Sequence, residues 1–216
     1  MNKQKRAEAI LAVLENTYNG RKTALRFDSV FQLLVAVILS AQTNDNQVNR
    51  ITDILFSRYG DAKAFAKLTP QMLEPLIQTC GLYKNKAKNI IAASRIITEK
   101  FGGEVPSSKE DLLSLPGVGN KTANVILAVG FNIPALAVDT HVFRVANRLG
   151  LVRTKNPDET EAALIALIPK EKWADAHHWL IWHGRLVCTA RNPHCENCPV
   201  NELCPSRIKL KGNAAP

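Results

Sequence analysis

The sequence lacks any long run of apolar residues. Its longest apolar stretch, residues 30–41, is interrupted by Gln32 and Ser40, and it is shorter than the ~20 residues that a helix needs to cross a bilayer. An earlier apolar patch, residues 9–14, runs directly into Glu15 without the small-residue cleavage site of a secretory signal. We therefore expect a cytoplasmic protein that has no membrane span.

Cysteine is rare over most of the chain. Cys80 stands alone, and the other four cysteines lie within residues 188–204. Nothing next to Cys80 in the sequence would activate a thiolate, so we expect a small buried residue near the end of a helix. In a reducing compartment, four cysteines in one short segment favour a metal site over disulfide bonds.

Acidic residues are outnumbered by basic ones, and the formal net charge is +9. A basic excess of this size indicates a polyanionic partner, either a nucleic acid or an anionic membrane surface. The chain has 216 residues, of which 46% are hydrophobic. It is therefore long enough to bury a core in one large domain or in two small lobes.

Helical periodicity runs through almost the whole sequence. Apolar residues recur at three- and four-residue intervals, for example over residues 48–56, which is the spacing of a helix face. A Thr-Pro pair at 69–70 and an Asn-Pro pair at 156–157 each place a capping residue before proline, as at many helix starts. We predict an all-α fold of about nine or ten helices, with residues 28–41 as a central helix enclosed by the others.

The clustered cysteines have the spacing C-x6-C-x2-C-x5-C and are Cys188, Cys195, Cys198 and Cys204. Four thiolates in one segment suit either a tetrahedral zinc ion or a cubane iron–sulfur cluster. The long first spacing and the two Cys-Pro pairs favour iron and sulfide. We expect a structural role, because a metal centre stabilises a loop-rich segment that buries little apolar surface. Arg191, between the first two cysteines, either contacts a phosphate or is merely solvated.

A glycine-containing turn joins the helices predicted near residues 108–115 and 120–129. Its glycines, Gly117 and Gly119, allow the backbone to approach an anion closely, and the next helix offers unpaired N–H groups at the positive end of its dipole. The pattern predicts a helix-hairpin-helix, an element that also occurs in ligases, polymerases and nucleases. On this motif alone, Lys121 is one more phosphate contact.

Asp139 stands in the segment Ala-Val-Asp-Thr-His-Val, directly before another amphipathic helix. Its ordinary role there is an N-cap that accepts hydrogen bonds from backbone N–H groups. A carboxylate held in this way can also stabilise positive charge that develops in a reaction. Capping and catalysis are therefore compatible for Asp139.

The hairpin with Lys121, the segment around Asp139 and the four-cysteine segment occur together, in this order, in the endonuclease III family of helix-hairpin-helix DNA glycosylases. The chain resembles that family over nearly its whole length. The resemblance implies a bifunctional DNA glycosylase and AP lyase of base excision repair that removes oxidised or ring-saturated pyrimidines. The amine of Lys121 would attack C1′ of an extruded nucleotide while Asp139 stabilises the sugar cation, and the Schiff base would allow β-elimination 3′ to the abasic site.

The same resemblance implies an arrangement of two helical lobes with the DNA-binding cleft between them. A six-helix barrel with the helix-hairpin-helix would span residues 23–133. A cluster lobe would combine residues 1–22 and 134–216, with a [4Fe–4S] cluster on residues 188–204. We expect a monomer that binds damaged double-stranded DNA and is associated with the nucleoid through that binding.

Two further segments, residues 39–43 and residues 81–83, are similar to the loops with which the family enters the duplex. They assign Gln42 to the orphaned partner base and Leu82 to a wedge between base steps. Without the resemblance, Gln42 would be interpreted as a capping residue and Leu82 as core at a helix end.

Two other functions fit part of the pattern. The adenine mismatch glycosylases share the scaffold and the cluster, but Lys121 occupies the place of a nucleophile and makes that resemblance weaker. A non-catalytic DNA-binding or electron-carrying cluster protein would use Lys121 only to contact phosphate.

A set of aromatic and histidine residues suggests a stacking platform or a second metal site, but its helical spacing predicts core packing: Trp173, His177, His178, Trp179, Trp182 and His183.

Overall fold

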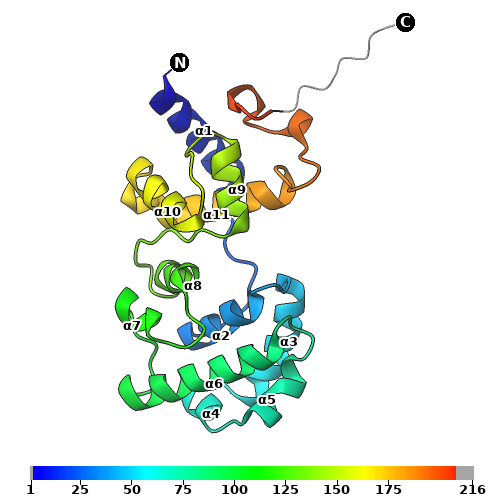
Figure 1. Cartoon of the computed structure of the whole chain (residues 1–216), viewed down its shortest axis with the longest axis vertical. Helices are drawn as coiled ribbons and strands as arrows, with labels where there is room; N and C mark the ends of the chain where they lie inside the picture. The colour runs from blue at the N-terminus through cyan, green and yellow to red at the C-terminus, as the bar shows by residue number, and fades with distance from the viewer. Residues whose placement is uncertain (1, 208–216) are drawn as a thin grey trace, which may run out of the picture. The chain divides into compact units, whose positions relative to one another are not determined.

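Helices make up all the regular secondary structure of the described residues. The structure is a computed structural model that describes residues 2–207, and there it contains eleven α-helices and four short π- or 3-10-helical segments (Figure 1). The prediction of an all-α fold is confirmed. The excess over the predicted number comes from short helices such as α4 (Ala62–Ala66) and α7 (Lys109–Leu113), which have five residues each and show no full helical period. None of the helices over residues 2–207 is long and apolar enough to cross a bilayer.

The chain divides into two compact units. We call Thr23–Ala135 the middle unit, and the described residues 2–22 and 136–207 the terminal unit. The middle unit contains α2 (Val30–Ser40), α3 (Asp45–Arg58), α4, α5 (Pro70–Ile77), α6 (Tyr83–Lys100), α7, α8 (Asn120–Val125) and the π-helical η1 (Ile126–Gly130). The terminal unit contains α1 (Lys3–Tyr18), α9 (Thr140–Arg148), α10 (Pro157–Leu167), α11 (Trp173–Leu186) and the 3-10 segments η2 (Lys170–Lys172), η3 (Cys195–Asn197) and η4 (Asn201–Leu203).

Helix α2 is the central helix of the middle unit. Every residue from 31 to 39 is buried, and α2 contacts α3, α6, α8 and η1. The helix begins at Val30, because Ser29 adopts an extended backbone and its side chain accepts a hydrogen bond from the N–H of Gln32. The one polar side chain inside this buried stretch is satisfied locally, since Oε1 of Gln32 accepts from the N–H of Asp28 (2.8 Å). The prediction of an enclosed central helix is confirmed.

Other local predictions of helix starts and burial are also confirmed. Thr69 is the N-cap of α5 and Asn156 is the N-cap of α10, each with proline in the first turn. Cys80 is buried, and its N–H donates to the carbonyl oxygen of Ile77, the last residue of α5.

The second helix of the predicted hairpin differs from expectation in its last turn. It begins at Asn120 as predicted, but it changes from α- to π-helical geometry at Ile126. The π turn brings Gly130 against α2, where a Cβ would lie 2.9 Å from Cγ1 of Val30. A single π turn is too short to alter the apolar periodicity of the sequence, so the pattern predicted a continuous α-helix.

Both ends of the described chain contribute to the terminal unit. Helix α1 packs against α11, which packs against α9 (Figure 1). Apolar side chains from all three helices fill one core, including Ile10, Leu14, Val145 and Leu180. The aromatic and histidine residues of α11 belong to this core as predicted: Trp179, His177, His178 and His183 are buried, and Trp173 and Trp182 pack against it.

Candidate active site

Asp139 is the N-cap of α9. Its Oδ1 accepts hydrogen bonds from the N–H groups of His141 and Val142, both at 2.8 Å, which confirms the predicted cap. Both bonds use the same oxygen, so Oδ2 takes no part in the cap. The segment before Asp139 is held from α11, because the ring of His177 is hydrogen-bonded through Nδ1 to the carbonyl oxygen of Ala137 (2.7 Å). Asp139 thus presents a carboxylate oxygen from a fixed backbone.

Lys121 lies on the first turn of α8, in the middle unit, and it is half-buried. The turn before it depends on its two glycines for different reasons. Gly117 has a φ of +82°, and a Cβ there would lie 2.9 Å from Cβ of Asn89. Gly119 is the N-cap of α8, and a Cβ there would meet nothing within 4 Å. The hairpin therefore needs glycine at 117 for its shape, while the backbone at 119 borders open space that an anion can enter.

Gln42 and Leu82 occupy two short loops that meet. Both residues have left-handed backbones, with φ of 56° and 58°, which non-glycine residues rarely adopt. Gly81 lies against the first loop, since a Cβ on it would be 3.3 Å from the carbonyl oxygen of Gln42. Leu82 is 60% exposed, so its interpretation as helix-end core is wrong. The C-cap of α2 is Ala41 and the N-cap of α3 is Asn44, so the interpretation of Gln42 as a capping residue is also wrong.

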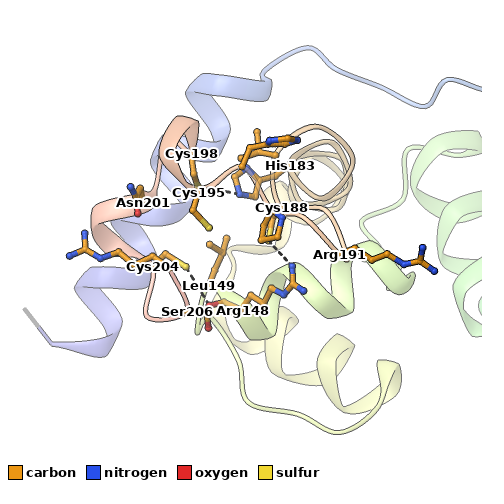
Figure 2. Close-up of a pocket in the computed structure, with 14 residues that line it drawn as sticks. Arg148, Leu149, His183, Cys188, Arg191, Cys195, Cys198, Asn201, Cys204 and Ser206 are labelled. Atoms are coloured by element: carbon orange, nitrogen blue, oxygen red, sulfur yellow. Dashed lines mark hydrogen bonds between the residues drawn. The ribbon is translucent and has the colours of Figure 1, made fainter. Parts of the chain in front are cut away.

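The four clustered cysteines line one cavity of the terminal unit. Its volume is about 230 Å³, and Cys188, Cys195, Cys198 and Cys204 all border it (Figure 2). All four have free thiols. The four thiols surround this cavity, an arrangement that suits a cubane with one thiolate per iron.

Two arginines of α9, which the sequence did not single out, fasten the start of the cysteine segment. Arg148 donates from Nη1 to the carbonyl oxygen of Thr189 (2.7 Å), and the same nitrogen lies 3.7 Å from Sγ of Cys188. Arg144 donates from Nη2 to the carbonyl oxygen of Gly184 (2.9 Å) and from Nε to that of Cys188 (3.2 Å). The spacing of four residues was a usable signal, because it places both guanidinium groups on one face of the helix.

A buried pair of side chains, Tyr18 and His183, approaches the cysteines from α1 and α11. Nδ1 of His183 lies 3.0 Å from Oη of Tyr18, and Nε2 lies 3.7 Å from Sγ of Cys198. Burial lowers the pKa of His183 to about 4 and raises the pKa of Tyr18 to about 12. Burial also raises the pKa of the Cys198 thiol, and neighbouring cysteines add to this shift. The ring is therefore neutral and the phenol protonated at neutral pH.

Arg191 is exposed, and Figure 2 shows its side chain directed away from the cysteines. Although Arg191 borders the cavity, its guanidinium group points to the solvent.

Known proteins resemble this chain over nearly its whole length. The family model of HhH-GPD superfamily base excision DNA repair proteins matches residues 35–170, and that of the iron–sulfur binding domain of endonuclease III matches residues 188–204. Endonuclease III of Synechocystis sp. is 48% identical over 206 residues, which are 95% of this chain and 94% of the relative. Endonuclease III of Escherichia coli K12 is 44% identical over 210 residues, which are 97% of this chain and 99% of the relative.

Among solved structures, that of a trapped endonuclease III–DNA covalent intermediate with an estranged adenine is similar to this chain throughout. The TM-score is 0.92 at 40% identity, and the match covers 95% of this chain and 97% of that one. The matched family models together include the residues singled out above at the hairpin, at the start of α9 and in the cysteine segment.

Proposed function

Because the chain belongs to the endonuclease III family of helix-hairpin-helix DNA glycosylases, we propose that Lys121 is its nucleophile and that Asp139 stabilises the sugar cation. As a member of this family the protein is a base excision repair DNA glycosylase and AP lyase, it binds DNA and it has a [4Fe–4S] cluster. One observation carries the proposal. The hairpin places Lys121 on the first turn of α8, beside the open backbone at Gly119. In agreement with a nucleophile, one solved structure similar to this chain is that of a trapped covalent intermediate between endonuclease III and DNA.

The reaction requires a nucleotide outside the base stack, because C1′ of a stacked nucleotide is inaccessible to a side chain. The Nζ–C1′ bond forms as the glycosidic bond breaks, and the departing base takes up a proton. In this proposal the carboxylate of Asp139 stabilises the positive charge that develops on the sugar. The C1′–O4′ bond then breaks, so that the sugar ring opens, O4′ takes up a proton from the amine, and an Nζ=C1′ Schiff base forms. The Schiff base makes the C2′ protons acidic, and loss of one of them to water expels the 3′ phosphate. Water then releases Lys121.

Exposed residues of both units support the recognition of duplex DNA. Gln42 offers an amide to the orphaned base, and Leu82, which is apolar and 60% exposed, can occupy the gap that the extruded nucleotide leaves. The backbone at Gly117 and Gly119 would receive a phosphate, and the exposed Arg191 would add a further phosphate contact. The substrates that this proposal assigns are damaged double-stranded DNA with oxidised or ring-saturated pyrimidines.

The residues that border the cavity fit the cluster. Cys188, Cys195, Cys198 and Cys204 would supply the four thiolates, and Arg148 would offset part of their negative charge through its contact with Cys188. The cluster would supply binding energy that fixes the loop-rich cysteine segment to α9 and α11. We further propose that the protein acts as a monomer in the cytoplasm, associated with the nucleoid; its net charge of +9 supports attraction to DNA.

Borohydride trapping tests the central assignment. Wild-type protein mixed with duplex DNA that contains an oxidised pyrimidine should become covalently joined to the damaged strand. Lys121→Gln should bind the same DNA and form no adduct, because the variant has no amine at this position. Lys155→Gln, at an exposed position of the terminal unit, is the matched control and should trap like the wild type. An adduct with Lys121→Gln would show that another amine is the nucleophile.

A further inference from the structure

Lys86 is buried although it carries a charged group. It lies in the first turn of α6 and is 5% exposed. Its ammonium donates to the carbonyl oxygens of Leu39 (2.8 Å) and Ala41 (2.5 Å) and to Oγ1 of Thr43 (3.3 Å). An ammonium group has three N–H donors, so each donor has a partner inside the protein. Lys86 is thus committed to these contacts and is not a surface cation for DNA.

These acceptors lie at the end of α2 and in the loop that follows. Leu39 and Ala41 belong to the last turn and the C-cap of α2, where carbonyl groups have no partner within the helix and favour a positive charge. Ala41 and Thr43 are the two chain neighbours of Gln42. The ammonium therefore holds the backbone immediately before Gln42 and the side chain immediately after it.

The backbone of Lys86 connects to the second loop. Its N–H donates to the carbonyl oxygen of Leu82 (3.1 Å), which begins the hydrogen-bond ladder of α6. Lys86 is thus bonded to Leu82 through its main chain and to both neighbours of Gln42 through its side chain. Gln42 and Leu82 hold left-handed backbones, and such conformations persist where surrounding contacts fix them.

We propose that Lys86 is a positioning residue that fixes the Gln42 loop relative to Leu82, so that both side chains enter the duplex as one rigid pair. This inference rests on the proposed gap-filling function of Gln42 and Leu82. Lys86 thus links the Gln42 loop to the Leu82 loop through hydrogen bonds. Burial lowers the pKa of Lys86, an effect that Cys80 opposes. Holding both residues in place before DNA arrives reduces the ordering cost of binding.

The test compares Lys86→Met, which keeps an apolar chain of similar length but removes the donors, with Lys88→Met at an exposed position of α6. Each variant is given an oxidised pyrimidine in duplex DNA and the same lesion in a single strand, where there is no orphaned base. We expect Lys86→Met to lose about tenfold to a hundredfold in kcat/KM on the duplex and little on the single strand. Lys88→Met should match the wild type on both substrates.

A merely structural role would reduce both activities by the same factor, because it would lower the fraction of folded enzyme. Equal losses on duplex and single strand, or no loss, would overturn the proposal. If Lys86→Met does not fold, Thr43→Val removes one of the three acceptors, and it should show a smaller loss that is still selective for the duplex. Equal losses of activity on the duplex and on the single strand with Thr43→Val would also overturn the proposal.

Parallel measurements on Gln42→Ala separate this proposal from the function on which it rests. The double variant Gln42→Ala with Lys86→Met should lose little more kcat/KM on the duplex than Gln42→Ala alone, because Lys86 acts through the position of Gln42. A selective loss with Gln42→Ala that Lys86→Met fails to reproduce would reject the role of Lys86 alone. Equal duplex and single-strand losses with Gln42→Ala would reject the gap-filling function as well.

Discussion

Oη of Tyr18 lies 3.0 Å from Nδ1 of His183, whose other ring nitrogen lies 3.7 Å from Sγ of Cys198. A neutral imidazole has one N–H group and one acceptor nitrogen. When Cys198 is a thiolate ligand, Nε2–H of His183 donates to the sulfur, and Nδ1 accepts from the protonated phenol of Tyr18. The last residue of α1 thus fixes the tautomer of a ring that contacts the cysteine segment.

Tyr18→Phe should therefore lower the stability of the cysteine segment without changing the shape of the core. Removing the phenolic donor leaves Nδ1 of His183 buried without its partner, which costs about 1–3 kcal/mol. We expect a lower unfolding temperature and a faster loss of visible absorbance when an iron chelator is added. Tyr59→Phe, in the middle unit, is the control and should release iron at the wild-type rate. Identical release rates for the two variants would contradict a role of Tyr18 at the cluster.

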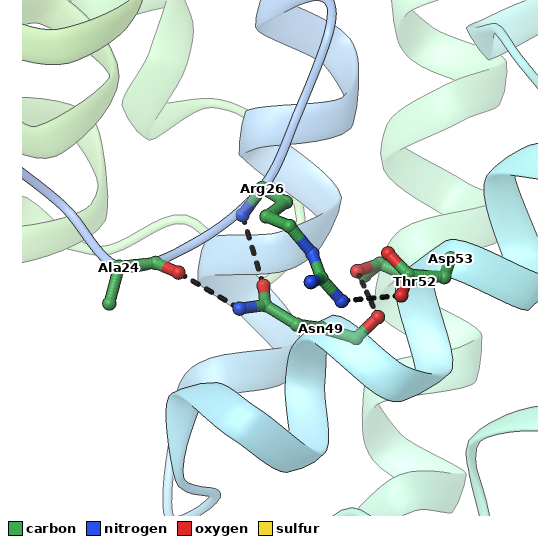
Figure 3. Close-up of polar contacts among 5 residues, drawn as sticks. All are labelled: Ala24, Arg26, Asn49, Thr52 and Asp53. Carbon is green, nitrogen blue, oxygen red and sulfur yellow. Dashed lines mark hydrogen bonds and ion pairs between the residues drawn. The ribbon is translucent and has the colours of Figure 1, made fainter.

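Asn49 on α3 fastens the segment that leads into α2 (Figure 3). Its Nδ2 donates to the carbonyl oxygen of Ala24 (2.9 Å), its Oδ1 accepts from the N–H of Arg26 (3.0 Å), and Arg26 is also paired with Asp53. Asn49→Ala should lower the free energy of unfolding by about 1–3 kcal/mol, because it removes two partly buried hydrogen bonds to the backbone. Urea denaturation measures this loss. Asn46→Ala, at an exposed position of the same helix, should change stability by less than about 0.5 kcal/mol.

Much of the fold follows from interactions between residues close together in the sequence. The helix periodicity, the start of α5 after Thr69 and the cap at Asp139 each depend on a few neighbouring positions, and all three were predicted correctly. Lys86 could not be predicted in this way. Helical spacing places Lys86 four residues before the buried Ile90 and so on the buried face of α6, but its acceptors lie more than 40 residues earlier in the chain, and spacing cannot identify them. Contacts between distant segments require the packed structure.

The burial of His178 should make the free energy of unfolding depend on pH. His178 is buried on α11, and burial lowers its pKa from 6.5, an effect that Asp175 opposes. Because its pKa is lower in the folded state than in the unfolded chain, the unfolded state binds more protons as the pH falls. This contribution to stability is present above about pH 6.5 and is lost as the pH falls below that value. His178→Gln should therefore lose less stability than the wild type between pH 7 and pH 5, measured by urea denaturation. An unchanged pH dependence would mean that folding does not lower the pKa of His178.

Asp139→Asn separates the two catalytic roles. Asparagine retains a side-chain oxygen for the N–H groups of His141 and Val142, so α9 keeps its cap, but the negative charge is lost. Base excision from a duplex with an oxidised pyrimidine should fall by roughly 10²-fold or more, because preorganised charge stabilises the transition state for breaking the glycosidic bond. Single-turnover excision measures this, and the thermal stability should stay near that of the wild type.

The same variant should behave differently on DNA whose base is already missing. No glycosidic bond remains to be broken there, and Lys121 is still present, so Asp139→Asn should retain trapping with borohydride and part of the strand cutting. Lys121→Gln should lose both on that DNA, since neither occurs without the Schiff base. The ratio of the excision rate to the trapping rate on abasic DNA is thus the discriminating quantity. A ratio that Asp139→Asn leaves unchanged would show that the carboxylate acts on the amine rather than on the sugar cation, because only an effect on Lys121 slows both reactions alike.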